Sequence, residues 1–128
     1  MPPVQVAESE YERLANLAAS NTSRGAALLG DELARAAVLK DDAVPGSVVR
    51  LGSVVAFTDL MTARTRRVQV VLPDDADIDR GRLSVLTPVG AALLGLTAGD
   101  SIAMSTEAGR SHVLRVEAVE AGEAAGAV

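Results

Sequence analysis

The residues that could carry out chemistry are few in this sequence. His112 is the only histidine, and the chain contains no cysteine. A zinc site that uses histidine ordinarily needs further protein ligands, so His112 is expected to be structural or solvated, and no metal is expected there. The lack of cysteine excludes a thiolate nucleophile, a disulfide framework and a cysteine metal site, and it fits a reducing compartment.

An acidic segment has carboxylates at alternate positions, which is the pattern that hard cations use. Its members are Asp74, Asp75, Asp77 and Asp79. The segment lacks the glycine at the sixth position and the closing glutamate at the twelfth that an EF-hand loop requires. We therefore interpret it as a solvated loop.

Basic residues also gather in one part of the sequence. They are Arg64, Arg66, Arg67, Arg80 and Arg82. Two interpretations remain open for this cluster: a charged edge that deters strand pairing, or a local contact for an acidic partner. No Ser-His-Asp order, P-loop or Gly-x-Gly-x-x-Gly motif is present, so the sequence predicts no catalytic centre and no cofactor.

Composition narrows the function classes further. The net charge of −5 disfavours an autonomous nucleic-acid binder, which would neutralise phosphates with Lys and Arg. Aromatic residues make up only 2% of the chain, namely Tyr11 and Phe57, so there is no stacking platform for bases and no aromatic wall for a prolyl pocket. No window approaches about 18 apolar residues, and the first residues lack a basic region followed by an apolar run. We expect no membrane span, no secretion and a cytoplasmic location.

Two helices joined by a polar turn are expected at the start of the chain. In residues 7–19, Ser9 and Glu12 have the spacing of a capping box. Apolar residues follow at three- and four-residue steps: Tyr11, Leu14, Leu17 and Ala18. A second helix is expected over residues 26–40. Each helix would span only about 20 Å, so the resulting antiparallel hairpin is a short arm.

Residues at three- and four-residue steps define one face of the second expected helix. The residues on it are Leu29, Leu33, Ala36 and Lys40. Asp31 and Arg35 lie one turn apart and could pair weakly. Pro45 and Gly46 oppose continuation of a helix and indicate a domain boundary near residue 44.

The remainder of the chain has the period of β-strands. Strands are expected over residues 48–51, 54–58, 65–72, 83–86, 101–105 and 111–119. The stretch from Leu83 to Asp100 contains a strand, a Thr87-Pro88 stop, a short apolar helix and an exit at Gly95. The fold class is therefore α+β: a two-helix hairpin, then a sheet of five or six short strands closed by one small helix.

The segment Leu-Ser-Val-Leu-Thr-Pro-Val-Gly-Ala-Ala-Leu-Leu-Gly-Leu-x-x-Gly-Asp, beginning at Leu83, resembles the hallmark segment of the C-terminal domain of the Gre transcription elongation factors. Its Thr-Pro-Val-Gly-Ala-Ala-Leu-Leu-Gly version is most similar to the Rnk-type regulators of nucleoside diphosphate kinase. The resemblance extends from Val48 to Val119. It implies an FKBP-like C-terminal domain, an N-terminal helical hairpin, and binding at the rim of the secondary channel of bacterial RNA polymerase.

The resemblance also divides the chain and suggests contact residues. With the boundary at Pro45 and Gly46, it implies a helical hairpin in residues 1–44 and an FKBP-like domain in residues 45–120, while the Ala, Gly and Glu content of residues 121–128 predicts a flexible tail. By position, the polymerase-docking residues would be Thr87, Pro88, Val89 and Gly90, with Ala91 and Leu94 packed beneath them. The channel-facing residues of the hairpin tip would be Asn21, Thr22, Ser23 and Arg24. A purely structural role for Pro88 and Gly90 in starting the helix remains open.

Gre factors stimulate cleavage of backtracked RNA with acidic residues at the hairpin tip, which help to hold a second magnesium ion. The corresponding tip here contains no carboxylate, and the nearest acids, Glu12 and Asp31, lie a turn or more away. We therefore expect a non-enzymatic, monomeric regulator that competes with Gre factors and meets nucleic acid only through the polymerase. Three alternatives remain: transcript cleavage with displaced acids such as Asp31, prolyl isomerisation, and an FKBP-like adaptor for another target such as nucleoside diphosphate kinase.

Overall fold

The structure is a computed structural model, and it describes residues 3–105 and 109–122. Most of the tail expected over residues 121–128 therefore lies outside the described residues. No helix in the described ranges is long and apolar enough to cross a membrane.

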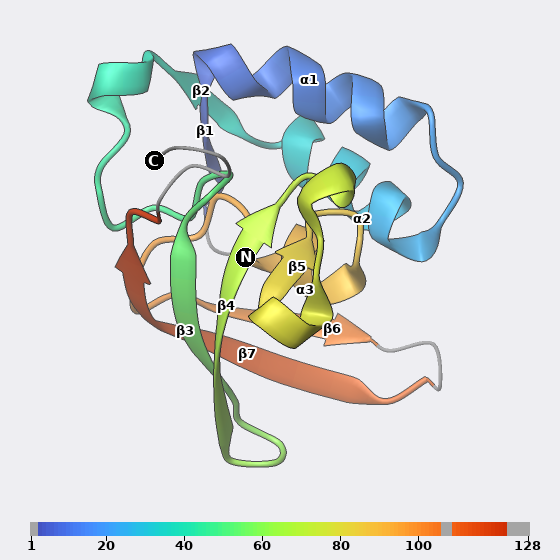
Figure 1. Cartoon of the computed structure of the whole chain (residues 1–128), viewed down its shortest axis with the longest axis vertical. Helices are drawn as coiled ribbons and strands as arrows, with labels where there is room; N and C mark the ends of the chain where they lie inside the picture. Colours follow the sequence, from blue (N-terminus) through green and yellow to red (C-terminus); the bar gives the residue numbers. More distant parts are fainter. Residues whose placement is uncertain (1–2, 106–108, 123–128) are drawn as a thin grey trace.

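The first part of the chain contains two helices flanked by two short strands. Helix α1 (Glu8–Ala19) is followed after a short turn by α2 (Arg24–Ala34). Strands β1 (Gln5–Ala7) and β2 (Ala37–Leu39) stand on either side of the helices and pair with each other in parallel. Figure 1 shows α1 lying across one end of the molecule.

A curled five-stranded sheet forms the rest of the fold, in the order β5-β4-β3-β7-β6. Its strands are β3 (Val54–Asp59), β4 (Arg64–Val71), β5 (Arg82–Ser84), β6 (Ser101–Ser105) and β7 (Ser111–Glu120). All neighbours are antiparallel except β4 and β5, which are parallel. Helix α3 (Pro88–Leu93) follows β5, and three 3-10 turns complete the order: η1 (Asp41–Ala43), η2 (Pro73–Asp75) and η3 (Ile78–Arg80). The predicted α+β class is confirmed.

One hydrophobic core joins the helices to the sheet. Alternate residues of each strand point to the same face, and the inward side chains of β3, β4 and β7 form a single cluster with α3. Leu14 of α1 and Leu29 and Leu33 of α2 are buried in that same cluster. The two N-terminal helices thus pack onto the body along one side rather than standing away from it.

Two of the expected elements, the second helix and the strand over residues 48–51, differ from the structure. The second helix begins at Arg24 and ends at Ala34, so Lys40 is not on a helix face, and residues 37–39 form β2. Pairing with β1 outweighs the helix preference of this alanine-rich segment. Residues 48–51, expected to be a strand, form only an isolated bridge between Val48 and Thr97 and then enter a turn at Leu51.

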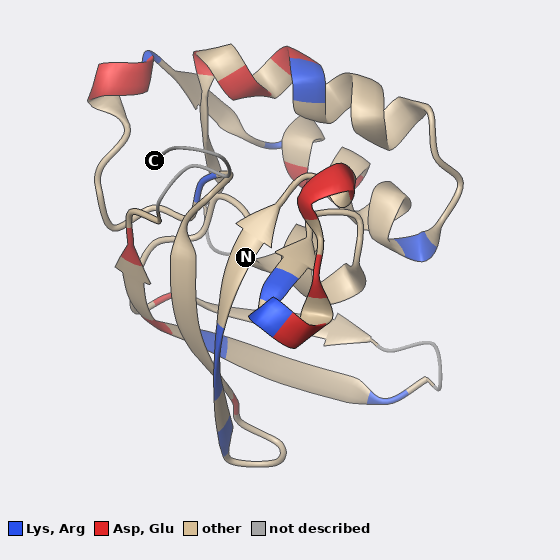
Figure 2. Ribbon diagram, in the orientation of Figure 1, with Lys and Arg blue, Asp and Glu red and all other residues tan. Residues whose placement is uncertain are grey.

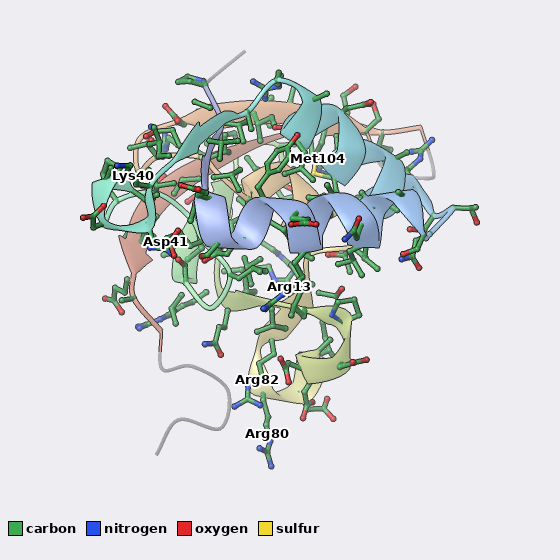
Figure 3. All side chains as sticks on the ribbon, turned by 90° about the horizontal axis from the view of Figure 1, so that it is seen from above. Arg13, Lys40, Asp41, Arg80, Arg82 and Met104 are labelled. Atoms are coloured by element: carbon green, nitrogen blue, oxygen red, sulfur yellow. The ribbon has the colours of Figure 1, made fainter. Side chains whose placement is uncertain are left out.

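The start of α1 is capped from outside the helix. Ala7 occupies the N-cap position without a side-chain hydrogen bond, so the predicted capping box of Ser9 and Glu12 is wrong. Instead, the Ser9 N–H donates to Asp41 Oδ1 at 3.0 Å, and Figure 3 shows Asp41 beside the first turn of the helix. Hydrogen bonding by Ser9 holds the pKa of Asp41 below its ordinary value.

Two ion pairs fix the helices more firmly than the sequence indicated. Arg35 pairs with Glu32 at 2.7 Å, and this pair takes the place of the expected contact with Asp31. Glu10 of α1 accepts from Arg50 Nη2 at 3.0 Å and from the Leu51 N–H at 3.3 Å. The contacts of Glu10 tie α1 to the segment that leads into the sheet.

Candidate functional site

The start of α3 is built as a tight, self-capped turn. Thr87 Oγ1 donates to the Ser84 carbonyl at 2.7 Å and accepts from the Gly90 N–H at 3.1 Å. Pro88 occupies the first helical position, where its missing N–H removes no helical hydrogen bond. A Cβ on Gly90 would overlap the carbonyl oxygen of Ser84, so only glycine allows this close approach.

The four predicted docking residues differ in what they present to solvent. Gly90 is buried, whereas Thr87, Pro88 and Val89 are half-buried. The four residues expected to dock the polymerase are therefore not a fully exposed loop. The hydroxyl of Thr87 is used in the cap, and the ring of Pro88 and the methyl groups of Val89 remain partly accessible.

The turn between α1 and α2 is polar and exposed. Ser23 Oγ accepts from the Ala26 N–H at 3.1 Å and so caps α2. Asn21 Nδ2 donates to the Leu17 carbonyl at 2.8 Å and closes the end of α1. Asn21, Thr22, Ser23 and Arg24 are all exposed.

The structure brings this turn next to the start of α3. A Cβ on Gly25 would overlap the Leu86 carbonyl oxygen, which means that the first turn of α2 lies directly against the chain that enters α3. Arg24 Nη1 donates to the Ser105 carbonyl at 3.4 Å and reaches the end of β6. The two groups of predicted site residues therefore meet, which their separation of some sixty positions in the sequence did not reveal.

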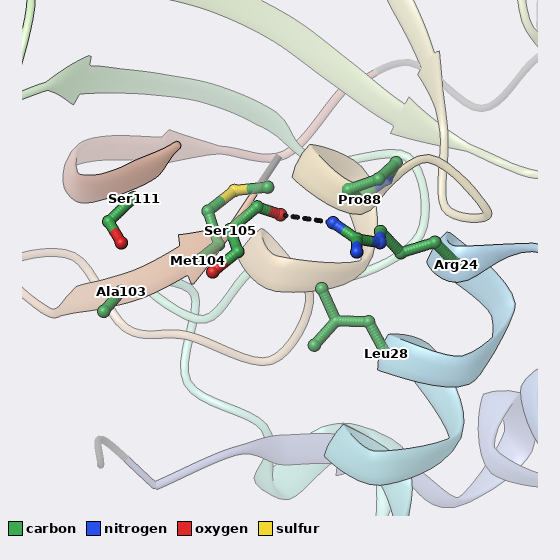
Figure 4. Close-up of a pocket in the computed structure, with 7 residues that line it drawn as sticks. All are labelled: Arg24, Leu28, Pro88, Ala103, Met104, Ser105 and Ser111. Atoms are coloured by element: carbon green, nitrogen blue, oxygen red, sulfur yellow. Dashed lines mark hydrogen bonds between the residues drawn. The ribbon is translucent and has the colours of Figure 1, made fainter. Parts of the chain in front are cut away.

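A hollow of about 340 Å³ lies where these elements converge, and we call it the Arg24–Pro88 pocket. Figure 4 shows Arg24 bonded to Ser105 across it, with Pro88 and Leu28 on the helical side and Met104 on the strand side. The other lining residues are Ala103 and Ser111. The pocket combines an apolar floor with one cationic side chain, which suits a protein partner better than a catalytic reaction.

A second hollow of about 270 Å³ lies on the other side of the first turn of α3, and we call it the Phe57–Arg66 pocket. Val89 lines this pocket, whereas Pro88 lines the first, and Met104 lines both. The start of α3 is thus a ridge between two hollows. Sequence analysis did not anticipate the second hollow, because it depends on how β3, β4 and β7 curl together.

His112 has a partner that sequence reasoning missed. Its Nδ1 lies 2.7 Å from Asp59 Oδ2. Burial alone would raise the pKa of Asp59, but hydrogen bonds from the Met61 N–H and from His112 outweigh it and lower the pKa. The sequence contains one indication of this contact: Asp59 lies just after the end of one predicted strand and His112 at the start of another, and antiparallel pairing brings such ends together.

The described residues offer no evident metal centre. Within residues 3–105 and 109–122, no three His, Asp or Glu side chains are grouped so as to hold a metal ion. In the acidic segment, Asp77 accepts from the Asp79 N–H at 3.2 Å and pairs with Arg80 at 3.5 Å, so one of its carboxylates organises the turn itself.

Comparison with known proteins matches the greater part of the chain to one family. The family described as "Transcription elongation factor, GreA/GreB, C-term" matches residues 44–121. Transcription elongation factor GreA of Hyphomonas neptunium is 37% identical over 81 residues, which cover 63% of this chain and 52% of that protein. GreA of Sinorhizobium medicae is 34% identical over 94 residues, covering 73% of this chain and 59% of the relative. The chain therefore spans between half and three-fifths of the length of these curated relatives.

Solved structures extend the similarity to the helices. A prokaryotic transcription elongation factor GreA/GreB from Nitrosomonas europaea is 33% identical and superposes with a TM-score of 0.74, covering 94% of this chain and 99% of that one. Gfh1 of Thermus aquaticus is 26% identical with a TM-score of 0.51, again over 94% of this chain and 99% of the other. The first match covers 94% of this chain, so the superposed region includes α1 and α2 as well as the sheet.

Proposed function

The chain belongs to the GreA/GreB family of transcription elongation factors through residues 44–121, and on that premise we propose that it is a regulator that binds bacterial RNA polymerase. The start of α3, which carries the family's segment, would be the docking element. One observation carries the proposal: Pro88 of that segment and Arg24 of the predicted tip line the same pocket. A single face could then touch the channel rim with both elements.

We further propose that the chain acts by occupying the site of Gre factors, as Rnk-type regulators would, without stimulating transcript cleavage. The exposed turn at residues 20–24 contains no carboxylate. Helix α1 is held to the body by Glu10 and by Asp41, so the arm is short and fixed. Cleavage stimulation requires acids that can share a magnesium ion with the polymerase, and this arrangement supplies none at the tip.

The test of docking is a pull-down with bacterial RNA polymerase core. The wild-type chain is expected to be retained, Pro88→Ala to be retained less, and an added excess of GreA to displace the chain. Pro73→Ala is the matched control, because Pro73 also begins a short helical turn but does not line the Arg24–Pro88 pocket. If wild-type protein does not bind core enzyme, the proposal is wrong; if Pro73→Ala and Pro88→Ala bind alike, the docking residue is misassigned.

A second candidate function is Gre-like cleavage stimulation, which is favoured by the curated relatives that carry the name transcription elongation factor GreA. Incubation of the chain with stalled elongation complexes distinguishes the two functions. Shortening of the RNA would establish cleavage stimulation, and an unchanged transcript length under conditions in which GreA cleaves would exclude it.

A further inference from the structure

The Phe57–Arg66 pocket forms where the inward faces of the strands continue past α3. Along β4 these inward positions are Val70, Val68, Arg66 and Arg64. The two valines are buried in the core, and the two arginines stand where the same face emerges into solvent. Figure 2 shows this basic half of β4 approaching the β3–β4 turn.

The floor of this pocket is apolar. It consists of Phe57, Val89, Met104 and Leu114, contributed by three strands and α3. Phe57 and Leu114 are buried, while Val89 and Met104 are half-buried and present their side chains to the hollow. A hollow of about 270 Å³ with such a floor can enclose a large apolar side chain.

The guanidinium groups of the two arginines at the mouth have no carboxylate partner among the described residues. Neither guanidinium group is hydrogen-bonded or ion-paired with a described residue, although that of Arg66 lies over the Phe57 ring, 6.0 Å from its centre. Their neighbour Arg67, on the opposite face of β4, pairs with Glu120 at 2.6 Å. Two cationic groups therefore flank an apolar floor with their donors available to a ligand.

The acidic side chain that lines the pocket forms no ion pair with these arginines. Asp59 lies opposite Arg64 in the strand register, yet its two oxygens are taken by His112 and by the Met61 N–H, at 2.7 and 2.9 Å. The adjoining turn exposes Leu60 and Met61, with 42% and 66% of their surface accessible. Apolar surface thus continues from the pocket onto the tip of the β3–β4 hairpin, which indicates an occupant larger than a small anion.

We propose that the Phe57–Arg66 pocket binds a segment of a partner protein in which a large apolar side chain is flanked by acidic residues. The apolar side chain enters the hollow over Phe57 and Leu114, and the carboxylates pair with Arg64 and Arg66. This site is separate from the Arg24–Pro88 pocket, across the ridge formed by α3. It goes beyond the proposed function because it assigns a second surface with its own ligand chemistry, which does not depend on polymerase binding.

The test is a titration of the full chain with an acetylated and amidated peptide, Gly-Asp-Glu-Leu-Phe-Asp-Glu-Gly, followed by NMR of methionine methyl groups. Met61 and Met104 are expected to shift, because both adjoin the pocket. Two further probes separate the possible occupants: the same peptide with alanine in place of leucine and phenylalanine, and inorganic phosphate. Neither is expected to reproduce the shift of Met104.

Variants decide whether the arginines recognise the acidic residues. Arg64→Gln combined with Arg66→Gln is expected to weaken peptide binding by about tenfold or more, through loss of charge-assisted hydrogen bonds. Arg67→Gln, on the same strand but the other face, is expected to change affinity by less than about twofold, as for an exposed charge. Both variants replace exposed side chains, and an unchanged melting temperature confirms that they fold.

Three results would overturn the proposal. The first is the absence of any Met104 shift at millimolar peptide. The second is an equal loss of affinity in Arg67→Gln, which would indicate attraction by net charge alone. The third is equal binding of the alanine peptide or of phosphate, which would make the site an anion site without an apolar specificity.

Discussion

Asp41 gives α1 the cap that the helix lacks in its own sequence. Its carboxylate accepts from the Ser9 N–H from outside the helix, and a negative charge at that end also complements the helix dipole. The interaction joins two segments that are 32 residues apart. A local cap would have been visible as a motif, whereas this one depends on the tertiary fold.

Replacing Asp41 with alanine is therefore expected to lower the melting temperature at neutral pH. Because the pKa of Asp41 is lowered from 3.8 in the folded protein, its contribution is complete above pH 3.8 and is lost as the pH falls through the folded value. Thermal unfolding from pH 7 to pH 2 should show the gap between wild type and Asp41→Ala closing at the acidic end. Asp42→Ala, an exposed neighbour, serves as the control, and a gap that is the same at every pH would contradict the assignment.

Glu32 is the buried acid of α2, and burial raises its pKa despite the ion pair and hydrogen bond with Arg35. The folded state therefore binds this proton more tightly than the unfolded state does. The stabilising effect is present below pH 4.5 and is lost as the pH rises through the folded pKa. Glu32→Gln removes this pH dependence of the stability, because glutamine does not titrate.

The melting temperature of Glu32→Gln, relative to wild type, is accordingly expected to rise between pH 4 and pH 7. Differential scanning calorimetry of both proteins over that pH range measures the difference in melting temperature. Asp31→Asn is the control, since Asp31 is exposed and adjacent. If the melting temperature of Glu32→Gln relative to wild type falls as the pH rises, the ion pair with Arg35 has a larger effect on the pKa of Glu32 than burial has.

At the scale of elements, the contact between α2 and the segment before α3 joins the two parts of the candidate site. Gly25 permits it, because any side chain there would overlap the Leu86 carbonyl. Gly25→Ala is expected to push α2 away and to destabilise the protein by about 1–3 kcal/mol, as overpacking does. It should also weaken polymerase retention, since Arg24 and Pro88 would move apart.

Gly30→Ala is the matched control for that change. A Cβ at Gly30 would meet only Ala18 at an ordinary distance of 3.9 Å, and alanine is the better helix former. Chemical denaturation should show Gly30→Ala to be more stable than wild type by about 0.5–1 kcal/mol. Similar loss of stability in both variants would mean that α2 does not depend on its approach to Leu86.

The elements that sequence could predict are those whose pattern is local. Strands β3, β4, β6 and β7 lie within one or two residues of the alternating runs, because alternation follows directly from burial of one face. Strands β1 and β2 have three residues each and pair across the whole helical unit, so no local pattern reveals them. The local spacing that predicts a helix over residues 26–40 likewise does not reveal that α2 ends at Ala34.

The candidate site shows the same limit. The types of Thr87, Pro88 and Gly90 indicate a helix start, and the structure has one there. Their position beside Arg24 follows from long-range packing and could not be predicted. Neither could the Asp59–His112 contact, which requires knowing that β3 and β7 are neighbours.

At the scale of the whole molecule, the proposed function makes a competition prediction. On stalled elongation complexes, a molar excess of the chain is expected to slow the cleavage that GreA stimulates and to cause none itself. Pro88→Ala should restore cleavage towards the rate with GreA alone, whereas Pro73→Ala should not. Gel analysis of transcript length measures this, and undiminished GreA activity at saturating chain would contradict it.

The small parallel pair of β1 and β2 has a consequence for how such a molecule can vary. The chain enters the helical unit at Gln5 and leaves it at Ala37, and these two residues are register partners. The two ends of the helical unit therefore lie side by side. Helices of another length could replace α1 and α2 between the same two strands without changing where the chain rejoins the sheet. The length of the helical unit and the architecture of the sheet are therefore separable.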